Sequence, residues 1–283
     1  ESAALLLGTL FHQVLEYHYA EDKDVNTVFA EFEGYCATGR LDSHPGLLEH
    51  VYREYLKHYK KEMAEEVLLM NETKVEIALD ADEEDIVVGV IDKVVQVSQQ
   101  IIQRDHKTTS GNLKYDVDMV RYNQQQLLYK QMVELTTEYN IDAIEIDEIK
   151  LAMLQSVPLN KNGKPTTDYR KLGLVTHDAY HETLVELGLD GDPDYDLILS
   201  RLMDRGHPLF RRTTVQIMDP NIVHENVLDF EATVKAIKRE ERFPRTRSIL
   251  CNYCGYKQLC KFDYTNPDEM DRQMLIKSEQ TLD

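Results

Sequence analysis

The spacing of apolar residues changes between residues 74 and 105, and this change most limits the fold. Residues 74–79 alternate polar and apolar side chains, residues 86–97 are rich in β-branched residues, and residues 100–105 continue as a short strand. The acidic stretch 80–85 and the glutamines at 99 and 100 are typical of hairpin connections. Three consecutive strands must bury a face against other elements, so they predict a sheet covered by helices.

Helical spacing on either side supplies those covering elements. We expect one α/β domain over residues 1–283, with a central mixed β-sheet flanked by helices and with accessory helices. Its expected regions are an N-terminal helical region over residues 1–70, a core 71–155, an insertion with helices 156–206, a strand, helix and cysteine cluster 207–263, and a tail 264–283. Helices are predicted over residues 3–20, 25–32, 46–70, 116–139, 177–187, 193–205 and 221–239, and further strands over 144–154 and 209–217.

The overall charge argues against a broad basic surface. The chain has 283 residues, with 32 Lys and Arg against 51 Asp and Glu, a formal net charge of −19. Basic residues nevertheless concentrate at residues 201–212 and 235–247. There they predict a local phosphate-binding track, although ion pairs with nearby acids explain any single arginine as well. The strongest candidates for phosphate contacts are Arg211, Arg212, Arg245 and Arg247.

Apolar stretches in the sequence are too short to cross a bilayer, so we expect no membrane span. The chain starts at Glu1, and a helical pattern is already running at Ala3. We therefore expect further residues upstream.

Two acidic residues and a lysine stand at unusual places in the predicted strands. Asp92 lies inside the apolar stretch VVGVIDKVVQ, and Asp105 and Lys107 lie two residues apart at the end of the next strand. A period of two puts Asp105 and Lys107 on one face, and hairpin pairing brings Asp92 near both. Converging carboxylates favour a divalent cation, and a neighbouring lysine can orient water and offset charge on a phosphate. The alternative is an ordinary edge or turn aspartate beside an Asp-x-Lys pair that arises by chance.

Two helical pairs add to this pattern. Gly8 and His12 lie one helical turn apart, as do Gln125 and Tyr129 on the helix after the strands. Each pair alone signals little, because a single histidine on a helix is more often a core or surface residue than a ligand.

The ordered set Gly8-x-x-x-His12, Gly89-x-x-Asp92, Asp105-x-Lys107 and Gln125-x-x-x-Tyr129 resembles the RecB-like branch of the PD-(D/E)xK nuclease superfamily. The resemblance implies a restriction-endonuclease-like core and a site for Mg²⁺ or Mn²⁺. His12, Asp92 and Asp105 would be the side-chain ligands, and the backbone carbonyl of His106 would complete the metal shell.

In that family the lysine positions or activates the attacking water, the role implied for Lys107. The resemblance gives Gln125 and Tyr129 the task of orienting the active site and contacting the DNA strand. One departure is that Arg104 and His106 flank Asp105, where apolar or aromatic neighbours are more usual. Neither position supplies a ligating side chain, so we expect activity to be retained.

The cysteines form a second motif. Cys251, Cys254 and Cys260 make a C-x2-C-x5-C cluster, and Cys36 stands apart. Zinc and an iron–sulfur cluster each want four ligands, so both remain open. The spacing resembles the iron–sulfur staple of AddB-type and CRISPR-adaptation nucleases in the same superfamily, which implies a [4Fe-4S] cluster. The fourth ligand would be a cysteine upstream of Glu1 or, less in keeping with the family pattern, Cys36.

Together these features predict a metal-dependent deoxyribonuclease, an exonuclease acting on DNA ends or single strands. Its size and insertion are similar to those of phage-type proteins of recombination, repair or DNA processing. We expect DNA and a helicase, recombinase or other DNA-processing protein as partners, in the cytoplasm of a bacterium or phage-infected cell. One rival is a catalytically silent DNA-binding or scaffold subunit, and another is a protein-binding module whose cysteines hold zinc.

Overall fold

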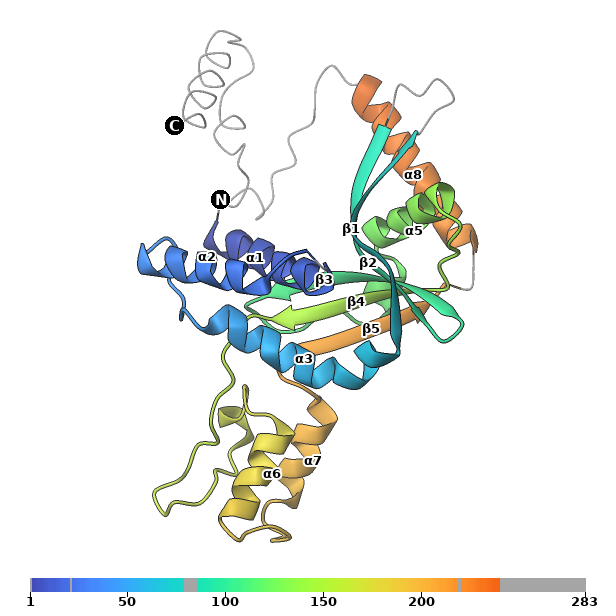
Figure 1. Cartoon of the computed structure of the whole chain (residues 1–283). Coiled ribbons are helices and arrows are strands. Elements are labelled where there is room, and N and C mark those ends of the chain that lie inside the picture. The colour runs from blue at the N-terminus through green and yellow to red at the C-terminus, as the bar shows by residue number, and fades with distance from the viewer. Residues whose placement is uncertain (1, 21, 79–85, 218–219, 240–283) are drawn as a thin grey trace, which may run out of the picture. The chain divides into compact units, whose positions relative to one another are not determined.

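The computed structural model describes residues 2–20, 22–78, 86–217 and 220–239 (Figure 1). The chain divides into two compact units, Glu1–Asp229 and Phe230–Asp283, and the β-sheet belongs to the first. Cys251, Cys254, Cys260, Arg245 and Arg247 lie outside the described residues. Among the residues that are described, no helix is both long enough and apolar enough to cross a bilayer.

Five strands form one mixed sheet in the order β1-β2-β3-β4-β5. The β3–β4 pair is parallel, and the other three pairs are antiparallel. This confirms the predicted α/β fold with a central mixed sheet flanked by helices. The strands are β1 (Glu66–Ala78), β2 (Ile86–Val97), β3 (Gln100–Thr109), β4 (Ala143–Lys150) and β5 (Phe210–Gln216).

Helices follow most of the predicted ranges, with two corrections. The helix expected over 116–139 is two helices, because Asn123 leaves the helical path and its side chain caps the second by accepting from Gln126 N at 3.2 Å. The helix expected to reach Met70 ends at Glu65, and residues 66–70 begin β1. The helices are α1 (Ala3–Tyr19), α2 (Val25–Ala37), α3 (Leu47–Glu65), α4 (Val117–Arg121), α5 (Gln124–Thr136), the short 3₁₀ helix η1 (Tyr169–Lys171), α6 (His177–Glu186), α7 (Asp196–Arg205) and α8 (Pro220–Arg239).

The two faces of the sheet carry different cores, and β4 shows why. Its side chains alternate between faces, so Ile144 and Ile146 join the cluster that contains Val120 of α4 and Leu127 of α5. Ile149, of opposite parity, joins the large cluster built by α1, α2 and α3. The 156–206 segment has a small core of its own, in which α6 and α7 pack through residues such as Tyr180 and Leu202.

A layer of buried charges lies between the sheet and α3. Three cations and three carboxylates make it up: Lys93, Arg104, Arg212, Glu66, Glu145 and Asp147. Glu66 accepts from Lys93 Nζ at 2.8 Å and from Arg104 Nη2 at 2.6 Å. Burial alone would raise the pKa of Glu66, but the hydrogen bonds and charges of Arg104 and Lys93 lower it to about 2.

Asp147 is the most enclosed member of this buried charge layer. Tyr55 Oη donates to Asp147 Oδ2 at 2.5 Å, Tyr59 Oη donates to Oδ1 at 3.2 Å, and Arg212 Nε lies 3.2 Å from Oδ2. Burial opposes ionisation here too, yet Arg212 and His106 hold the pKa of Asp147 well below its usual range. The carboxylate therefore stays charged inside the fold and ties α3 to β4 and β5.

Removing this carboxylate should destabilise the protein strongly. We expect Asp147→Ala to lower the free energy of unfolding by about 3–5 kcal/mol, because Arg212 and two tyrosine hydroxyls lose their acceptor while still buried. Urea denaturation measures the loss. The exposed Glu138 offers a control, and Glu138→Ala should change stability by less than about 0.5 kcal/mol. Equal midpoints for the two variants would contradict a structural role for the buried charge layer.

Candidate active site

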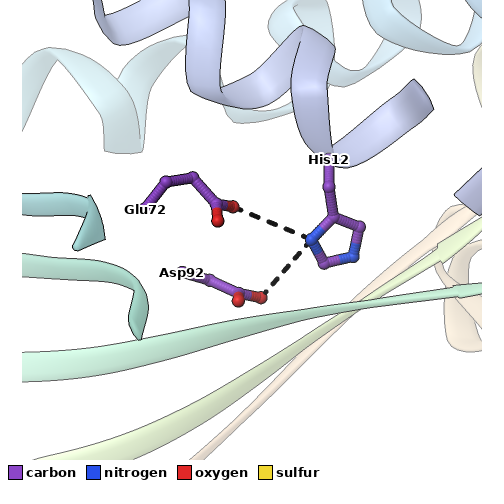
Figure 2. Close-up of side chains that lie close together, drawn as sticks. All are labelled: His12, Glu72 and Asp92. Carbon is purple, nitrogen blue, oxygen red and sulfur yellow. Dashed lines mark ion pairs between the residues drawn. The ribbon is translucent and has the colours of Figure 1, made fainter. Parts of the chain in front are cut away.

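Helix α1 brings His12 over the sheet because a glycine stands one turn earlier. A Cβ atom at Gly8 would lie 2.7 Å from Thr108 Oγ1 on β3, closer than normal packing allows. Glycine therefore permits α1 to approach β3 at this level. His12, four residues further along the helix, then reaches the β1–β2 hairpin, where it lies beside two carboxylates (Figure 2).

His12, Glu72 and Asp92 form the candidate metal group. His12 Nδ1 lies 3.8 Å from Glu72 Oε1 and 3.7 Å from Asp92 Oδ2, and the three ligand atoms lie within 4.8 Å of one another. Figure 2 shows both carboxylates directed toward the same ring nitrogen. A ring nitrogen with two carboxylate oxygens suits Mn²⁺ and also Mg²⁺, so the residues present fit the cation that the sequence predicts.

Glu72 was not among the residues that the sequence analysis selected. Its neighbours Asn71 and Thr73 pair with Lys93 and Ile91, which sets Glu72 across the hairpin from Asp92. Glu72 also has a φ of 42°, a left-handed conformation that is uncommon for a residue with a side chain. The predicted strand began at residue 74, so Glu72 fell outside it, whereas β1 in the structure begins at Glu66. Even with the longer strand, the position of Glu72 opposite Asp92 depends on the register of the hairpin.

Asp92 stands where β2 and β3 part. The β2–β3 pairing ends at Lys93 and Arg104. One residue further, Asp92 Oδ2 accepts a hydrogen bond from the backbone N–H of His106 at 2.8 Å. The Asp92 carboxylate thus accepts a hydrogen bond from β3 just past the last β2–β3 pair. This hydrogen bond fixes the position of the carboxylate beside His12.

A hydrogen-bonded chain links the other four predicted catalytic residues. Lys107 Nζ lies 2.8 Å from Asp105 Oδ2 and donates to Gln125 Oε1 at 3.3 Å, and Gln125 Nε2 donates to Tyr129 Oη at 3.0 Å. Lys107 is partly exposed, whereas Asp105 is buried. The lysine is therefore held from two sides, with its ammonium group near the surface.

Helix α5 presents Gln125 and Tyr129 because it packs closely on β2 and β3. Gln103 Nε2 donates to Gln126 Oε1 at 2.8 Å, which anchors the start of α5 to β3. At the other contact, a Cβ atom on Gly89 would lie 2.8 Å from Tyr129 Cε1. Gly89 of the predicted Gly89-x-x-Asp92 motif therefore has a packing role: it makes room for the tyrosine ring.

The electrostatics of the site favour a bound cation. Burial and the nearby Asp105 carboxylate raise the pKa of Asp92 to about 7. Burial lowers the pKa of His12, but the nearby carboxylates of Glu72 and Asp92 outweigh this and raise it. Carboxylates that repel one another around an imidazole are stabilised when a divalent cation lies between them.

The flanking residues Arg104 and His106 direct their side chains toward the buried charge layer, and the His106 ring also lies edge-on to the His12 ring, with the ring centroids 6.2 Å apart. Arg104 belongs to the buried charge layer, and His106 Nδ1 lies 3.4 Å from Asp147 Oδ2 in that same layer. Burial lowers the pKa of His106 to about 4, so its ring is neutral near pH 7. The His106 ring thus interacts with Asp147. The role of the His106 backbone carbonyl as a metal ligand stays a prediction.

The two described candidates for phosphate contacts differ sharply. The Arg211 side chain is 41% exposed and pairs with Glu148. Arg212 is 8% exposed, belongs to the buried charge layer and lies over the Tyr59 ring, which weighs against the predicted phosphate contact. Cys36 is a free thiol that packs against the core of α1, α2 and α3.

Metal affinity should depend on pH. A metal ion binds His12 and Asp92 only in their deprotonated forms, so protons compete with it. Because the pKa values of both groups are raised, Mn²⁺ should bind more tightly as pH rises from about 6 to 8. Calorimetric titration with Mn²⁺ measures this. We expect Glu72→Gln to weaken binding about tenfold, whereas Glu76→Gln, an exposed change on the same strand, should leave it unchanged. An affinity independent of pH would contradict this assignment.

Comparison with known proteins bears on the whole arrangement. The search of curated proteins found no match. A family model described as the PD-(D/E)XK nuclease superfamily matches residues 1–261, a range that includes the His12 helix, the three-strand core and the cysteine cluster. The chain therefore belongs to the PD-(D/E)XK nuclease superfamily.

Proposed function

We propose that this protein is a metal-dependent deoxyribonuclease that hydrolyses phosphodiester bonds, most simply as an exonuclease at DNA ends or in single strands. Membership of the superfamily supports the nuclease activity. The observation that carries the proposal is the position of Lys107, which is held by Asp105 and Gln125 and partly exposed. A non-catalytic scaffold would have no need to hold a lysine between two such partners.

His12, Glu72 and Asp92 would hold Mg²⁺ or Mn²⁺, and Asp105 would add a further carboxylate. When bound, the cation polarises the scissile phosphate and lowers the pKa of a water molecule. Asp92 has its orientation fixed by the His106 N–H, and Glu72 approaches from the opposite strand. Removal of the metal by EDTA should therefore abolish cleavage and leave the fold, which rests on other contacts, intact.

Lys107 would orient the attacking water and offset the negative charge that develops on the phosphate. Burial lowers the pKa of Lys107, but Asp105 outweighs this effect and the pKa is raised, so the ammonium group keeps its charge. Gln125 accepts from Lys107 and donates to Tyr129, so both help to fix the lysine and stand at the surface where a DNA strand would pass.

Further features of the proposal rest on the sequence. Cys251, Cys254 and Cys260 would hold a [4Fe-4S] cluster, with zinc as the alternative, and the fourth ligand would come from Cys36 or from upstream of Glu1. We further propose roles in recombination, repair or phage DNA processing, with a helicase or recombinase as partner, in the cytoplasm of a bacterial or phage-infected cell.

Substitution of the lysine tests the proposal. We expect Lys107→Ala to reduce cleavage of end-labelled DNA about 10²- to 10³-fold in Mg²⁺ or Mn²⁺, because a group that stabilises the developing charge is lost. Lys161→Ala, a change in the exposed insertion, should cleave at the wild-type rate. The position of the label and the use of single- and double-stranded substrates show which end and which strand are attacked.

The same assay separates the rival function. If wild type and Lys107→Ala both bind DNA but neither cleaves it in Mg²⁺ or Mn²⁺, the protein is a DNA-binding or scaffold subunit that keeps the nuclease fold. Equal cleavage by the two proteins would instead remove Lys107 from the mechanism.

A further inference from the structure

A basic cavity lies where β4 ends and β5 begins, apart from the His12, Glu72 and Asp92 group. Its volume is about 530 Å³, and Lys150, Arg205, Arg211 and Arg212 line it with a single carboxylate, Glu62. Four cations around one cavity are notable in a chain whose formal net charge is −19. Such a local concentration of positive charge attracts anions whatever the sign of the whole molecule.

Among the residues that the structure describes, two of these cations have no carboxylate partner. Arg205 donates to the backbone carbonyls of Leu172 and Val175, which orient its guanidinium group but carry no charge. Lys150 forms no ion pair with any residue in the part of the chain that the structure describes. Arg212 is paired with Glu62 and Asp147, and Arg211 is paired with Glu148. Lys150 and Arg205 therefore give the cavity its net positive charge.

The sheet register connects this cavity to the catalytic lysine. Lys107 pairs with Glu148 on β4, and Glu148 pairs with Arg211 on β5, so the three side chains share one row on one face. Adjacent strands lie about 4.8 Å apart, which places the backbones of Lys107 and Arg211 about 10 Å from each other. Lys150 lies two residues beyond Glu148 on the same face, close to the same row.

Glu148 fixes both Arg211 and the loop beside the cavity. This buried carboxylate accepts from the backbone N–H groups of Lys114 and Tyr115, at 2.6 and 3.0 Å, and from Arg211 Nη2 at 2.7 Å. The loop that these bonds hold includes Asn112, which lines the cavity. The basic groups are thus positioned before any ligand arrives, which reduces the entropic cost of binding.

We infer that this cavity binds a backbone phosphate of the DNA strand that is being cut, a short distance along the strand from the scissile phosphate. The inference rests on the proposed nuclease function and adds to it the path of the substrate. The rise of about 3.4 Å per nucleotide in B-form DNA is measured along the helix axis, and the backbone also winds around that axis. A separation of about 10 Å between phosphates therefore corresponds to roughly one or two nucleotides. Lys150 and Arg211 contact the phosphate, and Arg205, which also lines the cavity, supplies further positive charge.

Binding without cleavage tests the cavity directly. Fluorescence anisotropy with a labelled single-stranded 20-mer in EDTA should show Lys150→Gln binding about five- to tenfold more weakly than wild type at low salt. The slope of log affinity against log salt should fall by about 0.7, the value for one lost phosphate contact on a single strand. Lys164→Gln, the same change in the exposed insertion, should bind like wild type.

A small substrate separates this inference from the nuclease proposal. Bis(p-nitrophenyl) phosphate is too short to reach from Lys107 to the cavity, so Lys150→Gln should hydrolyse it at the wild-type rate with Mn²⁺. If Lys150→Gln and the charge reversal Lys150→Glu bind the 20-mer with wild-type affinity and salt slope, the cavity is not a phosphate site, although DNA cleavage stands. If Lys150→Gln also loses hydrolysis of the small ester, its effect is structural and the inference falls. A wild type that neither binds nor cleaves DNA would overturn both.

Discussion

The position of the proposed catalytic residues depends on the buried charge layer beneath β3. Arg104 and His106 enter this layer on one face of the strand, and Asp105 and Lys107 therefore emerge on the other. A slip of one residue in the register would exchange the two faces and bury Lys107 against α3. Because Arg104 needs Glu66 and Glu145 as partners, that slip would leave charges buried and unpaired. Electrostatic pairing on one side thus specifies the geometry of the other.

This arrangement explains the departure from the usual family pattern. Apolar neighbours on either side of the proposed catalytic aspartate, Asp105, would pack into a core, whereas here a charged and hydrogen-bonded layer occupies the same place. The layer is balanced, with three cations against three carboxylates, and the hydroxyls of Tyr55 and Tyr59 satisfy Asp147 further. A balanced buried network contributes less to net stability than an apolar core of equal volume, but it tolerates no change of partner. The buried charge layer therefore acts mainly by fixing the register of β3.

Local patterns in the sequence predicted the sheet, most helix ranges and the residues that surround Lys107. The pairs Asp105 with Lys107 and Gln125 with Tyr129 depend only on strand and helix periods, so their proximity follows from spacing. Glu72 could not be found this way, because its place depends on the hairpin register and on a left-handed backbone conformation. The burial of Arg212 also could not be predicted from the local pattern, because it depends on an ion pair with Asp147, which is distant in sequence. The break at Asn123 reflects a capping preference that the apolar pattern on both sides obscured.

The acidic character of the chain is compatible with a DNA substrate because charge acts locally in salt solution. At physiological ionic strength the Debye length is about 8 Å, so exposed carboxylates beyond that distance contribute little to the potential at the site. Along the row from Lys107 to Arg211, Arg211 is exposed and Lys150 lines the same cavity, while the carboxylate of Glu148 is buried and paired with Arg211. Of the other acidic residues nearby, Asp105 is paired with Lys107 and Glu62 with Arg212, and Glu72 and Asp92 are those that a divalent cation would neutralise. Metal binding and strand binding would therefore reinforce each other, since each lowers the cost of bringing a phosphate to the same row of side chains.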